Sequence, residues 1–98
     1  MAPYPELVLE YPENKYCLAL PGQEYVVYLR WGGTLKIDLK TTLEKDRFEY
    51  RWFDPGTGKS VTPKEINGGT EVFLSAPGGY PGNVNFQDWV LHVKKTSP

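Results

Sequence analysis

Cysteine and histidine are almost absent from this chain of 98 residues. Cys17 is the only cysteine and His92 the only histidine. An internal disulfide and a cysteine-based zinc site are therefore excluded. We predict that the chain carries no metal site and needs no cofactor.

The sequence also lacks long hydrophobic runs and an excess of charge of one sign. Runs such as Tyr25–Leu29 are far shorter than the ~20 residues that span a bilayer. The net charge is −1, so we predict no partner among nucleic acids or anionic membranes. Residues 1–5 lack the basic and apolar segments of a signal peptide. An exported protein would therefore need a signal outside this sequence.

Proline and glycine, by contrast, are plentiful and fall between strand-like runs, as in the loops of an all-β domain. Turn signals recur every 8–12 positions, and no window shows helical periodicity. The sequence thus predicts an all-β fold, a small antiparallel β-sandwich of about six to eight strands. Strands are expected at Tyr16–Leu20, Glu24–Arg30, Thr34–Lys40, Arg47–Asp54, Lys59–Val61, Thr70–Ala76 and Asp88–Lys94, with a connection at Thr62–Ile66 and loops at Asn67–Gly69 and Pro77–Asn83.

The clearest local signal is the run 47–58. Phe48, Tyr50 and Trp52 alternate with charged residues, which predicts a strand with one buried face. Asp54 can accept hydrogen bonds from the backbone ahead of it, and Gly58 can adopt a positive φ where the chain turns back. A β-hairpin is therefore expected here.

A second hairpin is expected to join strands 24–30 and 34–40 through residues 31–33. A three-residue loop would pair Val27 with Ile37 and would gather apolar side chains on one face. A two-residue loop would instead pair Tyr28 with Ile37, and we favour the three-residue register. The opposite face would carry the apolar Val26 and Tyr28, which something should cover.

The first 14 residues contain three prolines, and their apolar stretch is short. We interpret residues 1–14 as a lead-in or inter-domain junction that includes a linker or an edge strand. Residues 15–98 are then one β-sandwich domain.

No catalytic group emerges from the residue pattern. Lys59-Ser60 does not fit a phosphate-binding loop, because the turn glycine serves a hairpin and no helix follows. His92 has no second histidine and is expected at a surface or interface. Ser60, Ser75 and Ser97 lack the setting of a nucleophile, and structural roles are expected for Glu49, Asp54 and Asp88.

Aromatic side chains in or beside loops are the remaining candidates, because planar rings stack on sugars and anchor protein interfaces. Trp31, Tyr80 and Phe86 are the predicted ligand-binding residues, with Tyr80, between Gly79 and Pro81, the strongest. Trp52 and Trp89 lie within expected strands and are assigned to the core.

Taken in order, several short segments resemble the "putative collagen-binding domain of a collagenase" over about residues 15–94. They are Tyr16-Cys17-Leu18-Ala19, Pro21-Gly22, Tyr25-Val26-Val27-Tyr28-Leu29, Gly32-Gly33, Trp52-Phe53-Asp54-Pro55-Gly56-Thr57-Gly58, Ala76-Pro77 and Asp88-Trp89-Val90-Leu91. This resemblance implies a small β-sandwich that follows a TIM barrel of glycoside-hydrolase type, often apiosidase-like, in exported bacterial proteins.

The resemblance implies that the chain functions as a non-catalytic accessory domain. Its expected partner is the TIM-barrel catalytic domain of the same parent chain, with a polysaccharide as a further ligand. The alternative is a protein-binding module for collagen or another matrix protein. The third hypothesis, a small hydrolase, has little support from the residues. The expected location is extracellular or periplasmic.

Overall fold

The computed structural model describes residues 1–8, 15–30, 34–40, 42–43, 45–77 and 88–96. Over these residues the chain forms eight strands and one short 3-10 helix. Their bounds are β1 (Ala2–Pro3), η1 (Pro5–Leu7), β2 (Lys15–Leu20), β3 (Glu24–Leu29), β4 (Thr34–Asp38), β5 (Arg47–Phe53), β6 (Lys64–Asn67), β7 (Glu71–Ser75) and β8 (Trp89–Lys95). The predicted all-β class is confirmed.

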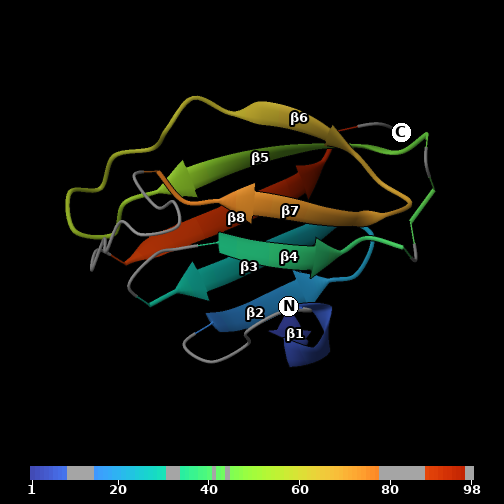
Figure 1. Cartoon of the computed structure of the whole chain (residues 1–98), viewed down its shortest axis with the longest axis horizontal. Helices are drawn as coiled ribbons and strands as arrows, with labels where there is room; N and C mark the ends of the chain where they lie inside the picture. Colours follow the sequence, from blue (N-terminus) through green and yellow to red (C-terminus); the bar gives the residue numbers. More distant parts are fainter. Residues whose placement is uncertain (9–14, 31–33, 41, 44, 78–87, 97–98) are drawn as a thin grey trace.

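The strands form two antiparallel sheets that pack face to face. Six strands make a large sheet in the order β1-β2-β3-β8-β5-β6, and β4 and β7 make a two-stranded sheet. Figure 1 shows the small sheet lying across the middle of the large one. The last strand, β8, is thus a central strand of the large sheet, flanked by β3 and β5. This arrangement is the predicted β-sandwich.

The core lies between the sheets and follows the alternation of the strands. Val27 and Leu91 of the large sheet and Ile37 of the small sheet have no exposed surface. Tyr25, 1% exposed, packs its ring against Phe48 with the centroids 6.2 Å apart. Trp52 and Trp89 are 5% and 8% exposed, so the assignment of both to the core is confirmed.

The predicted hairpin between strands 24–30 and 34–40 is wrong. Val27 pairs with Cys17 and Leu91, whereas Ile37 pairs with Val72. The chain crosses from one sheet to the other between β3 and β4. Both strands bury their apolar side chains in the same core from opposite sides, so the pattern identified the buried faces but could not identify the partners.

The region after the 54–58 turn also differs from expectation. Lys59–Val61 is not a full strand, since the return is one bridge between Phe53 and Ser60. The strand that pairs with β5 is β6, within the segment expected to be a connection. β6 escaped notice because Ile66 is its one apolar residue, and an edge strand can be held by backbone pairing alone.

The described part of the first segment, residues 1–8, packs on the sandwich. β1 pairs with the end of β2 at the edge of the large sheet. Val8 is 5% exposed and bridges to Ile37 of the small sheet. The first residues thus include an edge strand that joins the core, and the assignment of 1–14 as a junction between domains stays a prediction.

The turn after β5 has the chemistry that the sequence predicts. Oδ1 of Asp54 accepts a hydrogen bond from the Gly56 amide at 2.8 Å, and Oδ2 accepts one from the Thr57 hydroxyl at 3.0 Å. Gly58 has a φ of 76° and donates its amide to the Asp54 carbonyl. A side chain at Gly58 would be strained by that φ, although no atom stands in its way.

Removal of the Asp54 carboxylate should loosen this turn. We expect Asp54→Ala to lower the free energy of unfolding by about 1 kcal/mol, because the turn amide and hydroxyl lose their acceptor. Asp54→Asn keeps an oxygen for the Gly56 amide and should retain most of the stability. Urea unfolding of both variants provides the measurement, and equal losses for alanine and asparagine would contradict it.

Candidate functional site

The three ligand-binding residues predicted from sequence, Trp31, Tyr80 and Phe86, lie outside the described residues. Their role stays a prediction, and so does the loop that was expected at Pro77–Asn83.

Three residues considered as catalytic groups, His92, Glu49 and Asp88, each contact another side chain. Nε2 of His92 lies 2.5 Å from Oε2 of Glu24, on the solvent-facing side of the large sheet. Glu49 pairs with Arg51 at 3.1 Å. Asp88 accepts a hydrogen bond from the hydroxyl of Tyr28, and this bond raises the pKa of the tyrosine. Among the described residues, no group of three potential ligands could hold a metal ion.

A partly open pocket of about 270 Å³ lies at the edge of the sandwich, beside β5 and β6. Tyr50 and Trp52 of β5 contribute two aromatic rings, and Lys64 of β6 lies directly opposite Tyr50 in the sheet. All three side chains are on the inner face, which carries the core. The other lining residues are Val61, Thr62, Ser75 and Pro77.

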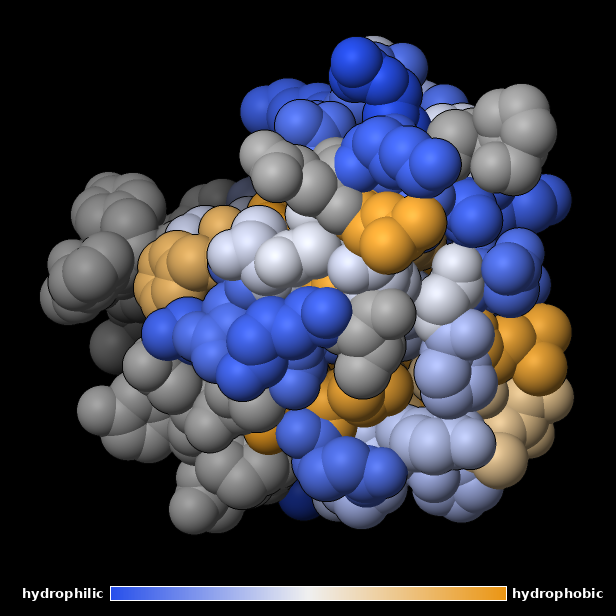
Figure 2. All heavy atoms as spheres, turned by 90° about the vertical axis from the view of Figure 1, so that its right-hand side faces the viewer, coloured by the Kyte–Doolittle hydropathy of each residue, from blue (hydrophilic) through white to orange (hydrophobic). Residues whose placement is uncertain are grey.

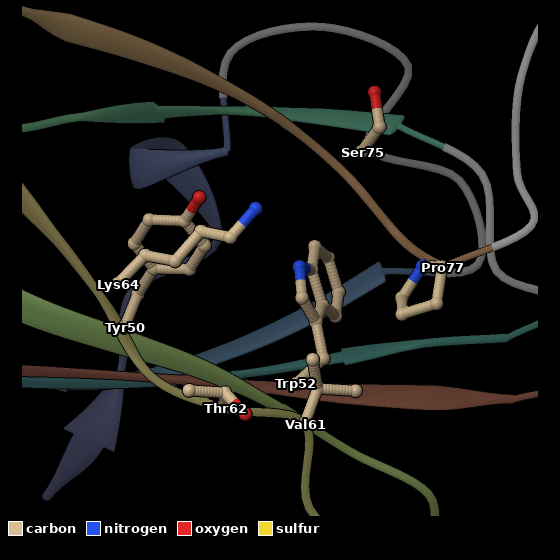
Figure 3. A pocket seen from close by; sticks show the side chains of 7 residues that line it. All are labelled: Tyr50, Trp52, Val61, Thr62, Lys64, Ser75 and Pro77. Carbon is tan, nitrogen blue, oxygen red and sulfur yellow. The ribbon is translucent and has the colours of Figure 1, made fainter.

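The described residues that line the pocket expose hydrogen-bond donors and include no carboxylate. In the view of Figure 3 the ammonium group of Lys64 lies between the phenol oxygen of Tyr50 and the indole nitrogen of Trp52. Lys64 forms no ion pair with another described residue. The carboxylates next to Tyr50 and Lys64 in sequence, Glu49 and Glu65, lie opposite each other in the strand register, on the other face of the sheet. The lining therefore carries a positive charge, with no ion-pair partner among the described residues, beside two aromatic rings.

Sequence reasoning missed this pocket. Tyr50 and Trp52 were assigned to the buried face, which is correct, but Lys64 fell in the expected connection. The alternation of β5 could not show that its inner face continues past the small sheet. A strand at 64–67, had it been predicted as the partner of β5, would have placed Lys64 beside Tyr50.

A second surface lies on the opposite side of the large sheet. We call it the apolar outer face and define it by Tyr16, Leu18, Val26, Tyr28 and Val90. Tyr16, Tyr28 and Val90 form one cross-strand row, and Leu18 and Val26 form the next. Tyr16 is 62% and Leu18 45% exposed. Side chains of this kind in adjacent rows make a continuous exposed patch, which is typical of a surface that contacts another protein.

Other exposed surfaces are more mixed. On the end of the sandwich seen in Figure 2, hydrophilic side chains gather at the top and hydrophobic ones form separate patches. On the small sheet, Glu71 pairs with Lys40 at 3.0 Å and with Lys36 at 3.2 Å. Hydrogen bonds from Lys40 and then Lys36 lower the pKa of the Glu71 carboxyl. These charges face solvent on the small sheet, whereas on the outer face of the large sheet the apolar side chains gather over β2 and β3 and the charged ones over β5 and β6.

The only cysteine is structural in its surroundings. Cys17 is 4% exposed, and burial, with a smaller effect from Glu6, raises the pKa of its thiol to about 11. A thiol that remains protonated at neutral pH is a poor nucleophile and a poor metal ligand.

The family described as "Putative collagen-binding domain of a collagenase" has a sequence model that matches residues 3–94. The chain belongs to this family. The match begins within β1, at Pro3, contains β2 to β7 completely and ends one residue before the end of β8, so the collagen-binding-domain family is defined over nearly the whole sandwich.

Solved structures show the same fold within larger enzymes. A chain described as a glycoside hydrolase superposes with a TM-score of 0.73 at 17% identity, over 98% of this chain and 21% of its own. A glycoside hydrolase family 5 protein from Bacteroides vulgatus ATCC 8482 gives 0.72 at 19% identity, over 94% and 20%. This member of the collagen-binding-domain family thus spans about a fifth of either hydrolase chain.

No curated protein matches the sequence. Within the described part of the chain, no helix is long and apolar enough to cross a membrane.

Proposed function

We propose that this domain is a non-catalytic accessory module of a glycoside hydrolase that packs on the catalytic barrel and also binds carbohydrate. The observation that supports packing is the apolar outer face, where Tyr16 and Leu18 are about half exposed. The share of the two hydrolases that the fold occupies, about a fifth, is consistent with one accessory domain in a larger chain. Extracellular or periplasmic location is part of the same proposal.

The outer face is suited to a permanent contact within one protein. Its rows run across β2, β3 and β8, so the backbone beneath them is held by hydrogen bonds on both sides of β3. Burial of an apolar sheet face against another domain lowers the free energy of the protein. Because this face is rigid, docking costs little conformational entropy. The next row is mixed, since Leu20, 49% exposed, lies beside Glu24, which in turn lies opposite Lys94 in the strand register.

The proposal is tested in a parent protein that joins this chain to its catalytic barrel. We expect Leu18→Ser to weaken the domain contact by about 1 kcal/mol, because docking can bury only the 45% of this leucine that is exposed. Phe73→Ser is the matched control, because Phe73 is 59% exposed on the other sheet. The melting temperature of the barrel and limited proteolysis of the junction are measured. A barrel whose activity and melting temperature survive deletion of this domain would rule out the packing role.

The alternative function is a protein-binding module for collagen or another matrix protein, which the family description favours. It predicts that the isolated domain is retained on fibrillar collagen. Retention no greater than that of an unrelated β-sandwich would remove this alternative and leave the accessory role.

A further inference from the structure

We propose that the pocket beside β5 and β6 binds a single sugar ring that bears a carboxylate, as in a uronic acid. This inference rests on the carbohydrate-binding part of the proposed function and adds a site and a ligand class to it.

The size of the pocket limits the ligand. Its volume of about 270 Å³ is below the ~300–1,000 Å³ typical of sites for drug-sized molecules. One ring fits this space better than an extended chain, which would have to continue along the edge of the sandwich. The pocket is partly open, so a terminal or side-branch residue of a polysaccharide can reach it.

The residues that line the pocket determine which chemical groups a ligand should carry. Tyr50, which is partly buried, supplies aromatic surface against which the C–H groups of a sugar ring can pack, and Trp52, 5% exposed, adds the small part of its ring that lines the pocket. Lys64, the phenol of Tyr50 and the indole N–H of Trp52 are hydrogen-bond donors on the same wall (Figure 3). A neutral sugar would leave the ammonium group without a charged partner, whereas a carboxylate gives it a charge-assisted hydrogen bond.

The strand alternation keeps this charge available. Glu65 follows Lys64 in β6 and Glu49 precedes Tyr50 in β5, so both point to the opposite face of the sheet. Arg51 pairs with Glu49 there. The acidic side chains next to the pocket in sequence are thus turned away from it, and the charge that faces the ligand is positive.

The test uses two ligands that differ only at C6, methyl β-D-glucuronide and methyl β-D-glucoside, titrated into the ¹⁵N-labelled 98-residue chain. We expect the glucuronide to shift the indole N–H signal of Trp52 and the amide of Lys64, and to bind at least about tenfold tighter than the glucoside. Lys64→Gln should remove that difference. Lys94→Gln, an exposed lysine on the outer face, should leave it unchanged.

Four results would overturn the proposal. Equal binding of the two glycosides would leave carbohydrate binding in place but exclude an acidic sugar. Shifts of the same size with sodium acetate or with an acidic peptide would show a carboxylate site without sugar recognition. If no glycoside shifts the pocket signals while a polysaccharide still binds the chain, the pocket is not the sugar site. If no sugar binds the chain, the carbohydrate part of the proposed function is removed as well.

Discussion

Phe48→Ala should lower the free energy of unfolding by about 4 kcal/mol, the largest effect expected for a single substitution in this chain. The ring of Phe48 is fully buried and packs on Tyr25 at a tilt of 59°. Truncation leaves a cavity between the sheets and removes the aromatic contact. A domain of this size has about 5–15 kcal/mol of stability in total, so the variant should be close to unfolding at 37 °C.

The control is the same substitution at an exposed site. Phe73 is 59% exposed on the small sheet, and Phe73→Ala should stay within about 0.5 kcal/mol of wild type. Thermal unfolding followed by far-UV circular dichroism compares the two. Similar losses for both variants would mean that Phe48 does not hold the two sheets together.

Gly68→Ala should cost about 3 kcal/mol, because the position has no room for a side chain. A Cβ there would lie 2.2 Å from Oγ1 of Thr42, 2.8 Å from the backbone oxygen of Leu43 and 3.0 Å from Cε2 of Phe48. The Thr42 hydroxyl cannot move aside easily, since it donates to the Leu39 carbonyl and accepts from the Gly69 amide. The Leu43 oxygen belongs to the backbone, so removal of the threonine side chain would not relieve the clash.

Gly22→Ala separates this steric effect from the ordinary cost of replacing a glycine. Gly22 has a φ of 82° with open space around it, so its substitution should cost about 1 kcal/mol from backbone strain alone. Chemical denaturation of the two variants gives the difference. A loss at Gly68 no greater than at Gly22 would show that the Thr42 contact yields without cost.

Local chemistry made part of the fold predictable. The turn at 54–58 depends on residues within five positions of one another, and the side chain of Asp54 and the backbone of Gly58 act as predicted. The pairing of β3 with β8, by contrast, joins residues that are sixty or more positions apart in the sequence. The alternation of apolar residues predicts which side of β3 is buried. Nothing in that segment indicates that Val27 pairs with Leu91 and not with Ile37. The assumed hairpin failed for that reason.

The candidate site was harder to predict than the fold. The sequence identified loop aromatics as ligand-binding residues, because exposed rings commonly bind. The pocket combines β5, β6 and the end of β7, and its lysine lies in a segment with one apolar residue. The apolar outer face was partly foreseen at Val26 and Tyr28. Its exposed part, Tyr16 and Leu18, became apparent only when β2 was placed beside β3.

The place of β8 between β3 and β5 determines the order in which the domain can be completed during synthesis. Before Trp89–Lys95 has left the ribosome, the strands β1-β2-β3 and β5-β6 are two separate ribbons with no backbone hydrogen bonds between them. Pairings between residues far apart in sequence also slow folding. The large sheet therefore closes only when β8 is available to pair with both ribbons, late in the synthesis of the domain.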